Sequence, residues 1–126
     1  MEQYDPDRDL AADEWLDLDE QERMMLVEDY HRRRRIRMRN VEAHAVVHAI
    51  VENQLAIEEP VVVAAFARLH REGLKRHDTV HAIGSVLAGQ LHSLLANPQN
   101  QDQPNERYHE ELGKLSASEW SRLTGR

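Results

Sequence analysis

The chain contains no cysteine, and this absence limits the chemistry open to it. Disulfide bonds and thiolate metal sites are excluded, so any bound metal must take imidazole or carboxylate ligands. Turn-forming and aromatic residues are also scarce, with 5 glycines, 4 prolines and 5% aromatic residues among 126. Such a composition favours helices over sheets and turn-rich folds. The sequence therefore predicts an all-α protein.

Long hydrophobic runs are also missing. The longest uninterrupted apolar stretch is Val-Val-Val-Ala-Ala-Phe-Ala at residues 61–67, which is far too short to cross a bilayer. The first residues have neither the basic start nor the apolar stretch of a secretory signal. We therefore expect a cytoplasmic protein with no membrane partner.

The net charge of -7 argues against general affinity for nucleic acid. The charge is uneven, because residues 1–30 are strongly acidic and residues 31–39 carry six arginines, Arg32 to Arg35, Arg37 and Arg39. Four consecutive arginines point all round a helix, and no aromatic residues interleave with them for stacking on bases. We expect solvated arginines that pair within the chain, with phosphate binding as the alternative. Whether the chain binds a protein partner or a second copy of itself is left open by the sequence.

Hydrophobic periodicity and capping signals predict a series of helices. Asp19 with Glu22 forms a capping-box pattern, Asn40 is a cap, and Glu59 precedes Pro60 at a first helical position. The predicted helices span residues 11–16, 20–36, 41–56, 61–72, 75–96 and 106–114, with a last turn around Trp120 and Leu123.

These helices predict a single-domain irregular bundle with four main helices and short terminal ones. Residues 1–10 are expected to form a flexible acidic arm. Residues 11–96 are expected to form the helical domain with the metal site. Residues 97–126 are expected to form a polar linker and short C-terminal helices.

Two pairs of histidines have the spacing of neighbouring turns of a helix. His44 and His48 lie at i and i+4, Glu52 follows at i+8, and His77 and His81 repeat the spacing on a second predicted helix. Both pairs share a helical face with apolar residues, so we expect them to be buried. Buried imidazoles need partners for both ring nitrogens. One shared cation would satisfy them together, and a metal-free hydrogen-bond network is the alternative.

The sequence therefore predicts a divalent metal site between two helices. Imidazole and carboxylate ligands suit Zn, Fe or Mn, and also Ni. The E-x-x-H spacing of carboxylate-bridged two-iron bundles is missing from a suitable place. This favours a single ion, or a histidine-rich pair of ions. The predicted ligands are His44, His48, Glu52, His77 and His81.

The catalytic candidates are carboxylates close to these histidines. The zinc-peptidase motif H-E-x-x-H places a general base after its first histidine, whereas this chain has Ala45 and Asp78 there. Asp78 is a shortened substitute, although a carboxylate in a first helical turn is favourable without catalysis. Glu52 is the better candidate for a ligand or for a base acting on bound water. Arg76 is expected to be solvated, with anion binding as the alternative.

The remaining histidines carry weaker signals. His31 lies on the packing side of its predicted helix and either reaches the site or simply packs. His70, His92 and His109 have no partner at i+4 and are expected at the surface. Gln54 points elsewhere on its helix and is expected to make structural hydrogen bonds.

The pattern resembles a family of small bacterial proteins of unknown function. In that family H-x-x-x-H-x-x-x-E-x-Q is followed by R-H-x-x-x-H, and here the second motif continues as Ala82-Ile83-Gly84. In that family the residue after the first histidine of the second pair is Glu, where this chain has Asp78. The resemblance implies an all-helical fold and a shared role for the matching positions, and it implies no activity. The matching positions are His44, His48, Glu52, Gln54, Arg76, His77 and His81.

Three classes of function follow from the sequence. The first is a metal-dependent enzyme, hydrolytic or oxidative, and the second is a metal-binding protein without catalysis. The third is a non-catalytic interaction module with a buried His/Glu network and an arginine-rich contact surface. We expect a metal-binding helical protein, and the reaction, if any, stays open.

Overall fold

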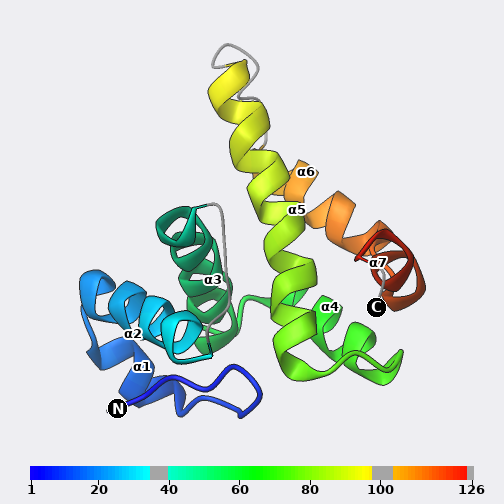
Figure 1. Ribbon diagram of the computed structural model, residues 1–126. Coiled ribbons are helices and arrows are strands. Elements are labelled where there is room, and N and C mark those ends of the chain that lie inside the picture. Colours follow the sequence, from blue (N-terminus) through cyan, green and yellow to red (C-terminus); the bar gives the residue numbers. More distant parts are fainter. Residues whose placement is uncertain (35–39, 98–103, 125–126) are drawn as a thin grey trace.

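The computed structural model describes residues 1–34, 40–97 and 104–124, and these residues form seven α-helices and no strand (Figure 1). The prediction of an all-α protein is confirmed. The helices are α1 Ala12–Asp17, α2 Glu20–Arg33, α3 Val41–Ala56, α4 Pro60–Arg71, α5 Arg76–Ala96, α6 Pro104–Lys114 and α7 Ala117–Thr124.

The predicted caps set the starts of the three helices that follow them. Asp19 and Glu22 form the full capping box of α2. The Asn40 side chain accepts a hydrogen bond from the backbone N–H of Ala43 at the start of α3. Glu59 caps α4, where Pro60 takes the first position. Local chemistry therefore determines where these helices begin.

Two hydrophobic clusters form the interior. One contains side chains from the N-terminal segment, α1, α2 and the first half of α3, with Trp15 and Val27 fully buried. The other lies among α3, α4, α5, α6 and α7, with Leu69 and Ile83 fully buried. Because α3 contributes to both clusters, it separates α1 and α2 on one side from α4 to α7 on the other (Figure 1).

The N-terminal segment holds a buried aromatic residue where the sequence predicts a flexible acidic arm over residues 1–10. The Tyr4 side chain is 0% exposed, and its ring packs on those of Trp15 and Tyr30. The backbone carbonyl of Pro6 accepts a hydrogen bond from Arg76 at the start of α5. The acidic composition of the segment predicts a flexible arm and gives no indication that its one aromatic side chain packs in the interior.

The arginine block begins with the intrachain pairs that the sequence predicts. Arg32 pairs with Glu28 at 3.5 Å and Arg33 with Asp29 at 2.8 Å, both one turn earlier on α2. The Arg34 guanidinium lies over the Tyr30 ring. The rest of the block, Arg35, Arg37 and Arg39, lies outside the described residues, as does the predicted end of this helix at residue 36.

The longest helix is α5, whose last turns extend beyond the other helices in Figure 1. Leu95 on these turns is 81% exposed. In the part of the chain that the structure describes, no helix has the length and apolarity needed to cross a membrane.

The difference in burial between Leu69 and Leu95 predicts different costs for the same substitution. We expect Leu69→Ala to lower the free energy of unfolding by about 2–5 kcal/mol, because it leaves a cavity in the core. Leu95→Ala should change it by less than about 0.5 kcal/mol. Urea denaturation of both variants measures the two values, and similar losses would contradict the packing of α4.

Candidate metal centre

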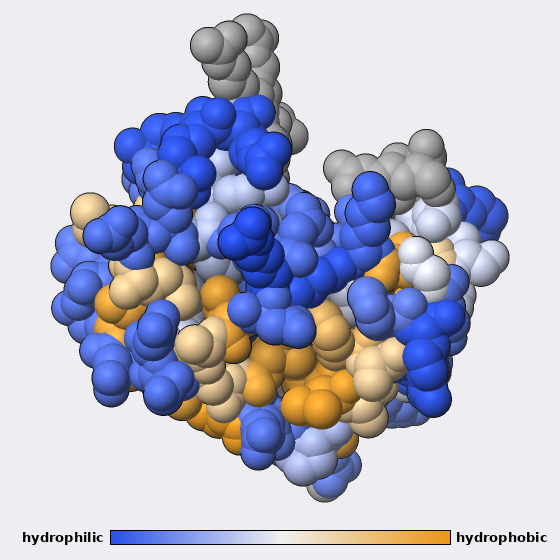
Figure 2. All heavy atoms as spheres, turned by 90° about the horizontal axis from the view of Figure 1, so that it is seen from below, coloured by the Kyte–Doolittle hydropathy of each residue, from blue (hydrophilic) through white to orange (hydrophobic). Residues whose placement is uncertain are grey.

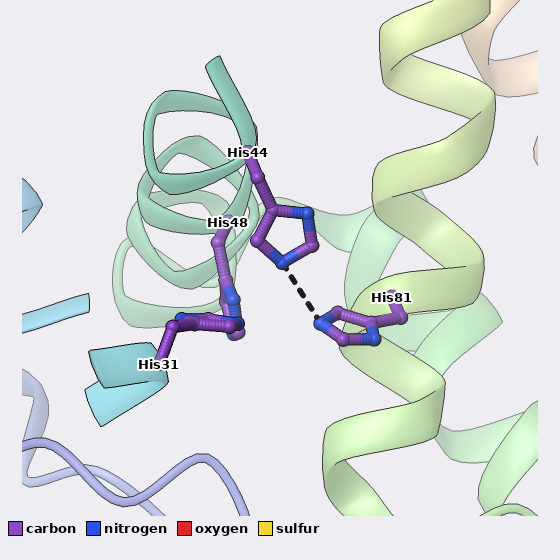
Figure 3. Close-up of side chains that lie close together, drawn as sticks. All are labelled: His31, His44, His48 and His81. Atoms are coloured by element: carbon purple, nitrogen blue, oxygen red, sulfur yellow. Dashed lines mark hydrogen bonds between the residues drawn. The ribbon is translucent and has the colours of Figure 1, made fainter. Parts of the chain in front are cut away.

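Five imidazole rings from three helices, α2, α3 and α5, lie close together. His31 lies in the last turn of α2, His44 and His48 lie in the first half of α3, and the other two lie at the start of α5. Ring centroids of contacting pairs are separated by 4.1 Å at the closest and 6.2 Å at the widest. Figure 3 shows His44 and His81 facing each other between α3 and α5, with His31 and His48 beside them. We call this group the histidine cluster: His31, His44, His48, His77 and His81.

The ring nitrogens of the cluster lie at distances close to those around a metal ion. His81 Nε2 is 3.1 Å from His44 Nε2 and 3.0 Å from His77 Nε2. One ring nitrogen from each of His31, His44, His48 and His81 lies within 4.8 Å of the others. Four nitrogens placed tetrahedrally at about 2.1 Å from zinc are about 3.4 Å apart. The two shortest separations in the cluster are a few tenths of an ångström below this value, and the upper limit for the four converging nitrogens is above it.

Hydrogen bonding sets the tautomer of His31. Its Nδ1 lies 2.8 Å from the backbone carbonyl oxygen of Val27. A carbonyl only accepts, so Nδ1 carries the hydrogen and Nε2 carries a lone pair. This Nε2 is buried and has no hydrogen-bond partner. A backbone carbonyl on the other ring nitrogen is the usual way in which proteins orient a metal-binding histidine.

The tautomer of His48 follows from its contact with Tyr4. The Tyr4 hydroxyl donates its only hydrogen to the carboxylate of Glu52, and its oxygen lies 2.7 Å from His48 Nε2. His48 Nε2 must then donate to that oxygen, which leaves the lone pair on Nδ1. Nδ1 is buried and also has no hydrogen-bond partner. Two buried imidazoles thus each hold one lone pair without a donor.

Glu52, which the sequence predicts as a ligand or base, has both carboxylate oxygens engaged by other groups. Arg76 donates to Oε1 and Oε2 at 2.8 Å each, and Tyr4 donates to Oε2. Glu52 is 1% exposed, and its oxygens are not among the donor atoms that converge in the described residues. It therefore contacts the cluster indirectly, through Tyr4 and His48.

Arg76 is buried in this ion pair, and the expectation that it is solvated is wrong. Its side chain is 10% exposed, and its Nε lies 3.4 Å from an Asp9 carboxylate oxygen. The bidentate contact with Glu52 raises its pKa further above the usual range and more than offsets burial, which lowers it.

The other residues that the sequence singles out, His77, Asp78 and Gln54, are not part of the converging group found among the described residues. The His77 ring stacks on that of His48 with centroids 5.5 Å apart, and its backbone N–H donates to Asp7. Asp78 is half-buried in the first turn of α5 and is outside the converging group found among the described residues. Gln54 accepts a hydrogen bond from the Tyr108 hydroxyl at 2.8 Å, a structural contact between α3 and α6.

Burial keeps two of the imidazoles neutral. Desolvation, followed by the neighbouring His31 and His77, lowers the pKa of His44 to about 4. Desolvation and the surrounding rings lower the pKa of His48 well below 6.5. Both rings are therefore uncharged at pH 7, which is the form that binds a metal ion.

A pocket of about 330 Å³ opens beside the cluster. His44, His48 and His81 form one wall, and the other walls come from α3, α5 and α7. Gly84 allows α3 and α5 to come close, because a Cβ there would lie 3.1 Å from Val47 Cγ1. The remaining lining residues are Ala43, Val47, Val80, Gly84, Ser85, Ala88 and Trp120.

A scan against protein-family models and searches of curated proteins and of solved structures find no match for this chain. His31 is the residue whose place in the centre the sequence leaves open. The indication for His31 in the sequence is its position on the packing face of its predicted helix, since no second histidine stands at i+4.

The buried ion pair predicts a specific pattern of stability. We expect Arg76→Met to lower the free energy of unfolding by about 3–5 kcal/mol, because Glu52 keeps a buried charge without its partner. The double variant Arg76→Met/Glu52→Gln should lose less than Arg76→Met alone, since that charge is gone. Urea denaturation at pH 7 measures both.

The matched control for this prediction is Arg32→Met, which removes an exposed pair with Glu28. Its loss should stay below about 1 kcal/mol. A double variant less stable than Arg76→Met alone would contradict the assignment of the buried charge.

The lowered pKa values predict that the metal-free protein is less stable in acid. Unfolded histidines take up protons below about pH 6.5, whereas folded His44 does so only near pH 4. Stability should therefore fall as the pH drops from about 6.5 to 4. His44→Gln should flatten this slope, and His92→Gln on the exposed part of α5 should not. Urea titrations across this range, with a chelator present, would show a rise on acidification if the assignment were wrong.

Proposed function

We propose that the protein binds a divalent transition-metal ion through ring nitrogens of His31, His44, His48 and His81, with His77 beside them. The observation that carries this proposal is the pair of buried lone pairs on His31 Nε2 and His48 Nδ1. Leaving a buried polar nitrogen without a partner is unfavourable. A single cation at the centre of the cluster would bind ring nitrogens of His31, His44, His48 and His81, and Nε2 of His31 and Nδ1 of His48 are the nitrogens of the two buried rings that have a lone pair to give.

The proposed ligand set differs from the predicted one at Glu52 and His31. Glu52 is given an outer position because Arg76 and Tyr4 engage its oxygens. His31 joins because one of its ring nitrogens lies with those of the other rings and because its Nε2 has no hydrogen-bond partner. Outer-shell partners of this kind orient ligands and raise their affinity. Tyr4 and Glu52 would play that part for His48.

An all-imidazole set narrows the choice of metal. Imidazole suits Zn, Fe and Ni, whereas Mn favours carboxylate and water oxygens. With the Glu52 oxygens engaged, Mn has less support than the other ions. A single bound ion is also favoured over two, because the converging group of described residues contains only imidazoles and no carboxylate that could bridge two ions.

The pocket beside His44, His48 and His81 supports an ion that is open to a small molecule. Four imidazoles would fill a tetrahedral shell, so a small molecule in the pocket would be a fifth ligand, and metal ions in catalytic sites can expand to five ligands. We therefore favour a metal-dependent enzyme over a metal staple. Of the two reaction classes, oxidation has more support than hydrolysis, because no carboxylate base is among the described residues that line the pocket.

The remaining predictions belong with this proposal. A single domain with four main helices, α2 to α5, is supported by the share that α3 takes in both hydrophobic clusters. Membership of the small bacterial family and a cytoplasmic location stay predictions from the sequence.

The alternative is a non-catalytic interaction module. His48, Tyr4, Glu52 and Arg76 already form a hydrogen-bonded network without an ion. Figure 2 shows a face on which apolar side chains gather between hydrophilic ones, and Ile57 is 62% exposed. This alternative accounts for the network and for a contact surface. It gives no partner to the lone pair of His31, and we therefore prefer the metal site.

Metal content tests the proposal directly. Purified protein, stripped with a chelator and dialysed against Zn²⁺, Ni²⁺ or Co²⁺, should retain about one ion per chain by elemental analysis. His48→Ala should weaken binding by more than the roughly 100-fold that loss of an outer partner produces. His81→Ala should do the same, because both rings lie in the converging group.

The matched control is His92→Ala, an exposed histidine on the same helix as His81. It should bind the metal as the wild type does. Circular dichroism checks that each variant keeps its helices. Equal metal content in the wild type, His48→Ala and His81→Ala would contradict the proposal, as would a wild-type protein that retains no ion.

A further inference from the structure

The pocket beside the histidine cluster has the size of a small-molecule site. Its volume of about 330 Å³ corresponds to about eleven water molecules at roughly 30 Å³ each. Ligand sites in proteins begin at about 300 Å³. The pocket therefore has room for a compact molecule and not for a nucleotide or a peptide.

The lining gives the pocket a specific chemical preference. No acidic, lysine or arginine side chain is among the described residues that line it. The hydroxyl hydrogen of Ser85 is already donated to the backbone carbonyl of Ala82 at 2.7 Å. A charged body would lose its hydration there without gaining a partner. The polar groups that remain are concentrated on the wall formed by the three imidazoles.

The apolar walls favour a flat, ring-sized body. Val47 and Val80 contribute branched apolar side chains from two helices, and Trp120 adds an indole side chain from α7. Aromatic side chains supply large apolar contact areas and pair well with other rings. Two of the small residues on α5, Ser85 and Ala88, keep the space open.

We propose that this pocket binds a compact, uncharged molecule with a single-ring apolar body and one lone-pair donor atom. The donor would be a fifth ligand of the metal ion held by the four imidazoles, and the body would lie against Val47, Val80 and Trp120. This inference rests on the proposed metal site and adds the class of ligand or substrate.

Two azoles with the same donor atom and different bodies test the proposal. Imidazole and 4-phenylimidazole are titrated into the Co²⁺-loaded full-length protein. The visible spectrum of Co²⁺ reports coordination of the donor, and Trp120 fluorescence reports the body. We expect 4-phenylimidazole to bind about tenfold more tightly or better, because its phenyl group is buried. Imidazole-4-carboxylate, which carries a charge, should gain no such advantage.

Variants at the mouth of the pocket locate the bound body. Ala88→Leu adds an apolar side chain to the pocket at a position that is exposed and is not one of the proposed metal ligands. It should weaken 4-phenylimidazole about tenfold or more while leaving metal content and imidazole affinity unchanged. Ala96→Leu, an exposed position at the far end of α5, is the matched control and should change neither. Trp120→Phe should remove the fluorescence response, because the other tryptophan, Trp15, belongs to the other hydrophobic cluster.

The outcomes separate this inference from the proposed function. Loaded Co²⁺ with equal affinity for the two azoles, or with no effect of Ala88→Leu, would overturn the pocket proposal and leave the metal site standing. Equal binding of 4-phenylimidazole to metal-free protein would overturn the role of the donor atom. A protein that takes up no Co²⁺ would overturn both, and its metal content would show this before any azole is added.

Discussion

The ion pair between Arg76 and Glu52 is the contact on which the rest of the centre depends. It joins the start of α5 to α3 with two hydrogen bonds of 2.8 Å in a buried place. Buried charges are tolerated when they are paired and hydrogen-bonded, and Tyr4 supplies a further hydrogen bond to Glu52. This need draws the N-terminal segment into the interior, where the Tyr4 oxygen also accepts from His48. The tautomer of His48 is thus a consequence of satisfying Glu52.

The histidine cluster lies where the two hydrophobic clusters meet. The first cluster fixes α2 against α3, and the second fixes α5 against α3. His31 therefore approaches from one side and His77 and His81 from the other. Neutral imidazoles are the form that this buried place favours, as the lowered pKa values of His44 and His48 indicate. The same burial makes the lone pairs available to a cation.

Much of the helical pattern could be predicted from short stretches of sequence. The predicted helix at 41–56 agrees with α3 at both ends, and the capping box at Asp19 is confirmed. These features depend on residues within one turn of one another. The inward direction of both i, i+4 histidine pairs also follows from periodicity, because the apolar face of each helix is visible in the sequence. The burial of Tyr4 could not be predicted in this way, because Tyr4 lies in an acidic segment and its partners are far away in the chain.

The sequence by itself determined the helices, their caps and the two pairs of imidazoles on apolar faces, because each of these depends on neighbours along one helix. Tertiary structure alone decided that Glu52 pairs with Arg76, that Tyr4 contacts His48 and that His31 enters the cluster. The first of these contacts joins residues 24 positions apart in the chain, and the second joins residues 44 positions apart. Helical periodicity gives the direction of a side chain from its own axis, whereas its partner depends on how the helices pack.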